Sequence, residues 1–114
     1  MTYDTVLVAL ADPTRRAILE LLKGGPSAVG ELADQLPVSR AAVSQHLRVL
    51  KDAQLVSETA MGTRHIYRAE PKGLLELRRY LESFWGQMLF AYAKKADKRP
   101  SRKFKKAQDR RQKP

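Results

Sequence analysis

The chain is 114 residues long and carries 22 Lys and Arg against 12 Asp and Glu, a formal net charge of +10, with no cysteine. A chain of this length forms one domain, and the absence of cysteine excludes disulfides, thiolate metal sites and cysteine nucleophiles. No apolar run approaches the roughly 20 residues of a membrane span, and charged side chains interrupt the N-terminal segment. We therefore expect no signal peptide, no membrane partner and a cytoplasmic location.

The positive charge is concentrated at the C-terminal end. Residues 98–114 contain nine basic side chains and one acidic residue, Asp109, whereas residues 1–97 are nearly balanced. A segment of this composition cannot bury enough apolar surface to fold alone. The sequence predicts a folded domain at 1–97 and a disordered basic tail at 98–114. The simplest role for the tail is sequence-independent DNA affinity through counterion release, with RNA contact or solubility as alternatives.

Turn signals divide the N-terminal half into short helices. Apolar residues around Leu7 predict an opening helix, and Asp12-Pro13 is typical of a second helix start. The Asp side chain accepts a hydrogen bond from an unpaired amide, and Pro has no amide to leave unpaired. Gly24-Gly25-Pro26 ends the second helix, and Ser27 is expected to cap a third, whose apolar face runs to Leu36.

A fourth helix follows after a very short connection. Leu36-Pro37-Val38 separates the third helix from Ser39, a candidate cap for the fourth, and this is helix-turn-helix spacing. Residues 55–59 and 64–69 then predict two strands, with a turn at Met61-Gly62. Pro71 opens a long last helix. The fold class we expect is mainly α with one β-hairpin, a winged helix-turn-helix.

The fourth helix has two unlike faces. A helical projection places Val43, Leu47 and Leu50 on one apolar wall. The opposite face is small and polar, with Ala41, Ser44, Gln45 and Arg48. Gln can bond adenine, Arg can bond guanine, and Ser can bond either kind of base edge. Ser39 and Arg40, at the helix start, are placed for phosphates. The alternative is an ordinary solvated surface.

Four segments resemble a known family: LADPTRRAIL at 10–19, VGELA at 29–33, SRAAVSQHLRVLK at 39–51, and residues 55–56 with GTRHIY at 62–67. They are similar to the opening helices, recognition helix and wing of ArsR/SmtB-type winged helix-turn-helix regulators. The resemblance implies a homodimer that binds operator DNA, usually as a repressor. It also implies that Ala41, Ser44 and Gln45 face the bases.

The sequence departs from the metal-sensing members of that family. The positions of their Cys-x-Cys pair are occupied by Ala28 and Gly30, and residues 72–97 contain no histidine. His46 and His65 lie on the recognition helix and the wing, so a closed metal site is not expected. The chain resembles the branch without metal ligands, which is also identified by LADPTRR and by an aromatic pair such as Phe84-Trp85. We expect no metal and no cofactor.

Several side chains have alternative roles. His46 flanks the apolar wall of its helix and either packs there or contacts DNA. The Arg15-Arg16 pair more simply braces helices than touches DNA. If Tyr67 packs inward, Arg64 and Arg68 point outward toward phosphates or the minor groove, and a one-residue slip reverses this. Otherwise these two arginines are solvated surface residues.

The last helix carries more apolar residues than a small domain can bury. Core packing and a cofactor pocket are alternatives, but the excess favours a dimer interface shared with the first helix. The expected interface residues are Leu7, Leu10, Leu81, Phe84, Trp85, Met88 and Leu89.

No pattern of catalytic residues is present. The sequence lacks a Gly-rich phosphate loop, a Ser-His-Asp-like group and a carboxylate pair with histidine, so we expect no enzyme. The function we predict is a sequence-specific, homodimeric transcriptional repressor that binds double-stranded DNA at an inverted repeat. The alternatives are an RNA-binding winged-helix protein and an architectural protein that coats DNA.

Overall fold

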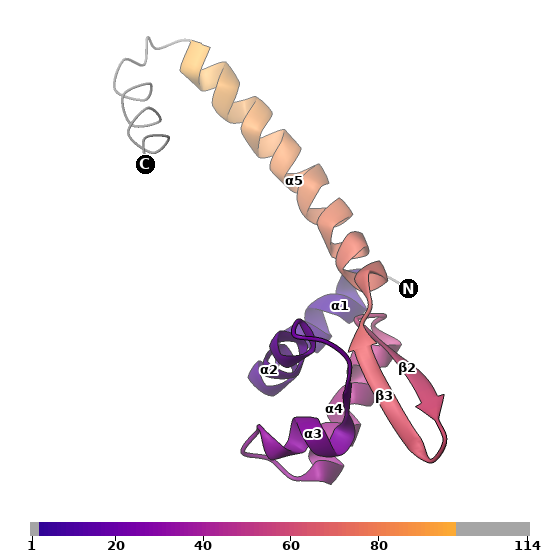
Figure 1. The fold of residues 1–114 in the computed structure, drawn as a ribbon. Helices are drawn as coiled ribbons and strands as arrows, with labels where there is room; N and C mark the ends of the chain where they lie inside the picture. Colours follow the sequence, from indigo (N-terminus) through magenta and orange to yellow (C-terminus); the bar gives the residue numbers. More distant parts are fainter. Residues whose placement is uncertain (1–2, 98–114) are drawn as a thin grey trace, which may run out of the picture. The chain divides into compact units, whose positions relative to one another are not determined.

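The computed structural model describes residues 3–97, and its element order agrees with the sequence prediction except for one additional short strand before the third helix (Figure 1). The elements are α1 (Tyr3–Leu10), α2 (Pro13–Leu22), β1 (Ser27–Ala28), α3 (Val29–Asp34), α4 (Arg40–Asp52), β2 (Val56–Met61), β3 (Arg64–Ala69) and α5 (Pro71–Asp97). The contacts divide the chain after Tyr80, so the start of α5 belongs with the other elements and the rest of α5 is separate. The predicted tail at 98–114 lies outside the described residues.

The junction between α1 and α2 is held by local hydrogen bonds. The Asp12 carboxylate accepts hydrogen bonds from the amides of Thr14 and Arg15, at 2.7 and 3.1 Å, which confirms the predicted cap. The hydrogen bond from the Arg15 amide is the main cause that lowers the pKa of Asp12. The Asp12 carboxylate is therefore ionised at neutral pH and pairs with the positive end of α2.

The two arginines at 15 and 16 brace these helices, as predicted. Arg15 Nε donates to the carbonyl oxygen of Ala9 at 2.7 Å, and Arg16 Nη1 donates to that of Leu10 at 2.6 Å. These carbonyls belong to the last turn of α1, where the helix offers them no partner of its own. The guanidinium groups thus end α1 and join it to α2.

The start of α3 differs from the prediction. Ser27 does not cap α3. It lies in β1, opposite Tyr67 of β3, and Ala28 is the residue at the N-cap. The Glu31 side chain accepts the Ala28 amide at 3.2 Å and so supplies the cap from inside the helix. The helix also ends at Asp34, before the predicted Leu36.

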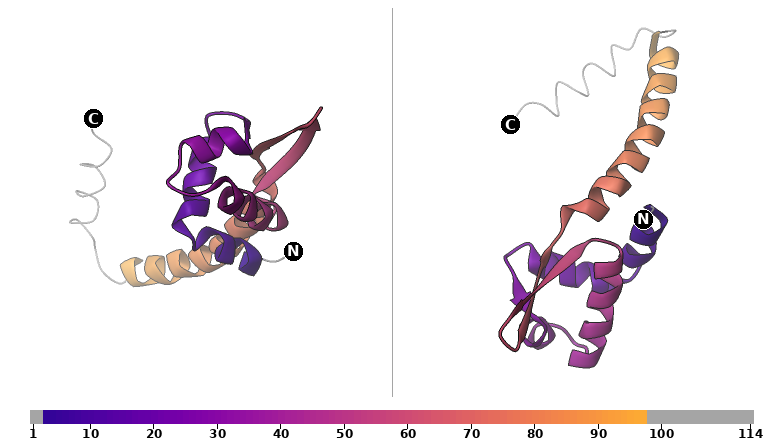
Figure 2. Two further views of the ribbon diagram at one scale, coloured as in Figure 1. Left: turned by 90° about the horizontal axis from the view of Figure 1, so that it is seen from below. Right: turned by 90° about the vertical axis from the view of Figure 1, so that its right-hand side faces the viewer.

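The hairpin belongs to a three-stranded antiparallel sheet of order β1-β3-β2. A two-residue strand such as β1 is too short to show a periodic pattern, so the sequence gives no sign of it. β2 extends to Met61, which pairs with Arg64, and Gly62 takes a φ of +66° in the turn between them. The β2–β3 hairpin projects beyond the helices that it packs against (Figure 2).

The core lies between the helices and the inner end of the hairpin. On α1, Val6 and Ala9 are fully buried, whereas Leu7 is 43% exposed. The Tyr3 ring stacks on Tyr80, with ring centroids 4.0 Å apart. The other buried apolar residues of this core are Ile18, Leu22, Leu32, Val43, Leu47, Leu50, Ala53, Leu55 and Val56. No helix in the described part of the chain is apolar enough over sufficient length to cross a membrane.

Gly73 permits a close approach between the first turn of α5 and the end of α4. Its amide donates to the Gln54 carbonyl at 2.8 Å, and a Cβ at this position would lie 2.3 Å from the carbonyl oxygen of Ala53. Backbone atoms cannot move aside as the end of a side chain can. We predict that Gly73→Ala lowers the free energy of unfolding by about 1–3 kcal/mol, measured by urea denaturation.

The matched control is Gly24→Ala, where the nearest atom to a Cβ would be the carbonyl oxygen of Leu21 at an ordinary 3.5 Å. We expect this variant to unfold close to wild type. Equal unfolding midpoints for the two variants would contradict the role assigned to Gly73.

Candidate nucleic-acid interface

The rotation of α4 is fixed by its cap and by its apolar wall. The Ser39 hydroxyl accepts the Ala42 amide at 3.1 Å, which confirms the predicted cap. Val43, Leu47 and Leu50 are fully buried. The predicted DNA-facing residues of this segment all lie on the exposed side, called here the α4 face: Ser39, Arg40, Ala41, Ser44, Gln45 and Arg48.

The arginines near this face differ in their partners. Within residues 3–97, no carboxylate lies at ion-pair distance from Arg40, Arg48 or Arg68, whereas Arg64 pairs with Glu31 at 2.8 Å. Arg40 lies over Gly30, since a Cβ there would be 3.2 Å from its Nη2. Three of these cations are therefore available to an anionic partner without the loss of an ion pair.

The strand β3 has the predicted orientation. Tyr67 is half-buried and packs on the core, and Arg64 and Arg68 are exposed. The Arg64–Glu31 pair is the feature that the sequence did not reveal, because 33 residues separate the two side chains. Arg64 is exposed, but in this structure it is directed to α3.

A carboxylate on β2 connects the wing to α4. Glu58 lies 2.9 Å from Lys51 Nζ on α4 and 2.6 Å from His65 Nδ1 on β3. The Lys51 hydrogen bond lowers the pKa of Glu58 and, reciprocally, raises that of Lys51. Burial is the main cause that raises the pKa of the neighbouring Tyr67. Glu58 thus holds the hairpin in a defined orientation beside α4, and sequence reasoning missed it.

His46 corresponds to the packing alternative. It is half-buried, and its Nδ1 lies 3.4 Å from Nη1 of Arg15 on α2. The α4 face therefore carries no imidazole, and the contact joins α4 to the arginine that caps α1.

The residues at the family's metal positions offer no ligands. Ala28 and Gly30 have no donor side chain, and in the described part of the chain no three His, Cys, Asp or Glu residues are gathered as a metal ion requires. His65 is instead paired with Glu58. Whether the protein responds to metals stays a prediction.

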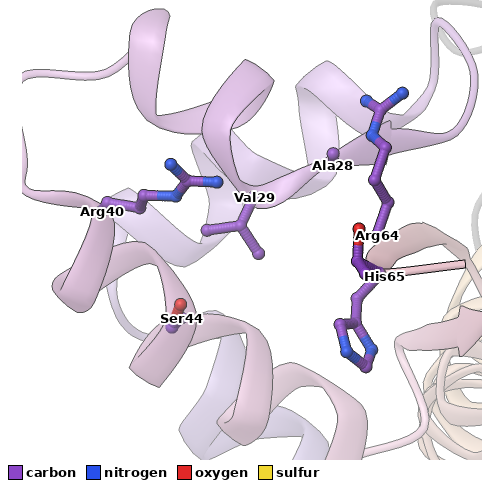
Figure 3. Close-up of a pocket in the computed structure, with 7 residues that line it drawn as sticks. Ala28, Val29, Arg40, Ser44, Arg64 and His65 are labelled. Carbon is purple, nitrogen blue, oxygen red and sulfur yellow. The ribbon is translucent and has the colours of Figure 1, made fainter. Parts of the chain in front are cut away.

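A hollow of about 250 Å³ lies between the start of α3, the first turns of α4 and the turn of the wing. Figure 3 shows Arg40 on one side of it, Arg64 and His65 on the other, and Val29 between them. Its lining residues are Ala28, Val29, Arg40, Ser44, Thr63, Arg64 and His65. This hollow could not be predicted from the sequence, because its walls come from separate elements of the chain.

The predicted dimer residues are mostly exposed. Leu10 is the exception, since it is half-buried against the core of its own chain. On the separate part of α5, a row of apolar side chains is about half exposed or more: Leu81, Phe84, Trp85, Met88 and Leu89. A row of this kind on a single helix has no partner within residues 3–97 that buries it.

The Glu58 contacts generate a pH-dependent prediction. Because the pKa of Glu58 is lowered on folding, the stability that it contributes is present above the ordinary carboxyl pKa of 4.5 and is lost as the pH falls through the lowered value. We expect Glu58→Gln to cost about 1 kcal/mol at neutral pH and little in acid, measured by urea denaturation at both.

Glu20→Gln is the matched control, because Glu20 and its partner Lys23 are both about 70% exposed. This variant should stay within about 0.5 kcal/mol of wild type at both pH values. A loss for Glu58→Gln that is the same in acid as at neutral pH would show that the carboxylate charge is not responsible.

The comparisons with known proteins agree with this geometry. A helix-turn-helix domain model matches residues 10–59. The HTH-type transcriptional regulator Rv2034 of Mycobacterium tuberculosis is 56% identical over 94 residues, which cover 82% of this chain and 88% of that protein. The transcriptional repressor SdpR of Bacillus subtilis is 42% identical over 52% of this chain and 66% of its own length.

Among solved structures, a homodimeric winged helix-turn-helix DNA-binding domain from Mycobacterium bovis, a candidate ArsR-family regulator, is similar at a TM-score of 0.59 and 30% identity. The match covers 74% of this chain and 78% of that domain. The relative at 56% identity spans most of both sequences, and the described fold has the helix-turn-helix and wing that the resemblance implied. The chain belongs to the ArsR/SmtB family of winged helix-turn-helix transcriptional regulators.

Proposed function

We propose that this regulator is a homodimeric repressor that reads an inverted-repeat operator with the α4 face. The observation that carries the proposal is the contrast between the two sides of α4. Its apolar wall is fully buried, and its other side presents short polar residues and arginines with no acidic residue in 39–51. Such a helix can enter a major groove without repulsion from phosphates.

Each residue of the α4 face has a role in this proposal. Gln45 bonds adenine through its amide, Arg48 bonds guanine, and Ser44 bonds a neighbouring base edge. Ala41 allows the helix to approach the bases closely. Ser39 and Arg40, in the first turn, bind phosphates and fix the position of the helix on the duplex.

On the wing, Arg68 and Arg64 are proposed to contact the backbone or the minor groove of the same half-site. Arg68 can contact DNA without the loss of an ion pair, because no carboxylate of residues 3–97 pairs with it. The basic residues at 98–114 add affinity for any DNA through counterion release. A regulator that binds operator DNA acts in the cytoplasm. It represses transcription by occupying the operator.

Double-stranded DNA is favoured over RNA by the position of the aromatic residues. Proteins that read single-stranded RNA stack bases on exposed aromatic rings. In the described residues, the exposed Phe, Tyr and Trp side chains are on α5, and the α4 face has none. The α4 face is therefore built for base edges in a groove.

Dimerisation is proposed through the exposed apolar residues of α1 and α5. A two-fold dimer presents two α4 helices to successive major grooves, about 34 Å apart. Support comes from the exposed row on α5 and from the homodimeric relative of known structure. Leu7 is proposed to contribute from α1, and Leu10 contributes less because its own core covers part of it.

Gln45→Ala tests the base contact. The operator is first located by footprinting on the protein's own promoter region. We predict that the variant loses about 1–3 kcal/mol of affinity for the operator and little for random DNA. Gln35→Ala, which removes the same exposed side chain from the end of α3, is the control and should not change the difference between the two DNAs. Equal losses on both DNAs for Gln45→Ala would move Gln45 from base reading to backbone positioning.

A double variant tests the dimer. Trp85→Glu with Leu89→Glu places charges in the exposed row, and we expect monomers in sedimentation and loss of operator binding. The control is Phe90→Glu, since Phe90 is 65% exposed on the same helix but lies on its opposite side in a helical projection. A wild-type protein that sediments as a monomer at micromolar concentration would refute the dimer.

A further inference from the structure

The hollow beside α4 has a lining that suits a sugar-phosphate unit of DNA. Ala28 and Val29 are apolar, and the Ser44 hydroxyl is a hydrogen-bond donor. Cationic groups come from two separate elements, Arg40 of α4 and Arg64 of the wing (Figure 3). A volume of about 250 Å³ admits a phosphate with part of its sugar.

The two arginines of the hollow are in different states. Arg40 has no carboxylate within ion-pair distance in the described residues, whereas Arg64 Nη2 lies 2.8 Å from Glu31 Oε1. Both members of this pair are exposed, Arg64 to 61% and Glu31 to 55%. An ion pair so accessible to water is weak, and a phosphate with full negative charge can replace it.

The carboxylate and the arginine also differ in freedom. The same Glu31 Oε1 accepts the Ala28 amide at 3.2 Å, so the carboxylate is tied to the backbone where α3 begins. Arg64 is a long side chain at the turn of the wing. Replacement of the carboxylate therefore requires movement of the arginine alone, with the cap of α3 intact.

We propose that the hollow binds one backbone phosphate of the DNA held by the α4 face, and that this phosphate takes the place of Glu31 on Arg64. The inference rests on the proposed function, because α4 must first be seated in the groove. Glu31 then acts as an internal competitor for DNA. It lowers the affinity for every sequence equally, so that stable binding depends more on the base contacts of α4.

A double-variant cycle tests the competition, with a short random-sequence duplex at several salt concentrations as the probe. Glu31→Gln keeps an oxygen for the Ala28 amide but removes the charge. We expect about fivefold tighter binding to the random duplex and to the operator alike. Arg64→Gln should weaken binding and reduce the slope of log K against log salt by about 0.9, the value for one phosphate contact.

The decisive result is the coupling between the two positions. In the Arg64→Gln background, Glu31→Gln should no longer tighten binding, because the ion pair between Glu31 and Arg64 is already absent. Arg40→Gln is the matched control background. It removes one cation from the same hollow without touching the Glu31 pair, so the gain from Glu31→Gln should persist there.

Two outcomes would overturn the proposal. Glu31→Gln could fail to tighten binding, or could tighten it equally in the Arg64→Gln background, which would make Glu31 a remote charge only. The absence of any operator footprint would instead contradict the proposed function. That result is distinguishable from the outcome of the double-variant cycle, which is measured on random-sequence DNA.

Discussion

Burial of the apolar wall of α4 is the constraint on which the rest of the molecule depends. Val43, Leu47 and Leu50 are fully buried, and each must remain so because exposure would cost on the order of 2 kcal/mol per side chain. Once these three are inside, the helix has no rotational freedom. The residues at 41, 44, 45 and 48 face outward as a consequence, whatever their own interactions are.

Polar contacts then set how the neighbours of α4 are placed. Arg15 joins the end of α1 to α2 and reaches His46, and Glu58 joins Lys51 of α4 to the wing. Each of these contacts links two different elements, and the Arg15–His46 contact joins residues 31 positions apart in the sequence. The hydrophobic core brings the elements together, and the ion pairs and hydrogen bonds determine their orientation relative to one another.

This division also explains which features the sequence could predict. Asp12 and Ser39 act on amides two or three residues away, so their cap roles follow from spacing. The wall of α4 follows from helical periodicity. Ser27 was assigned wrongly because its strand exists only by pairing with Tyr67, a contact that no local pattern shows. The Glu31–Arg64 and Lys51–Glu58 pairs, and the hollow between three elements, arise from the same kind of tertiary contact.

Acidic residues are distributed unevenly between α4 and the wing. The segment 39–51 contains none, whereas Glu31 pairs with Arg64 of the wing and Glu58 contacts His65 of the wing. Unpaired positive charge is thereby kept on the α4 face and reduced at the wing. Phosphate contacts add affinity for any sequence, and base contacts add it for one sequence. A regulator that partly neutralises its wing and leaves α4 free gives more weight to the helix that can distinguish bases, and Glu31 places part of that balance under the control of a single exposed ion pair.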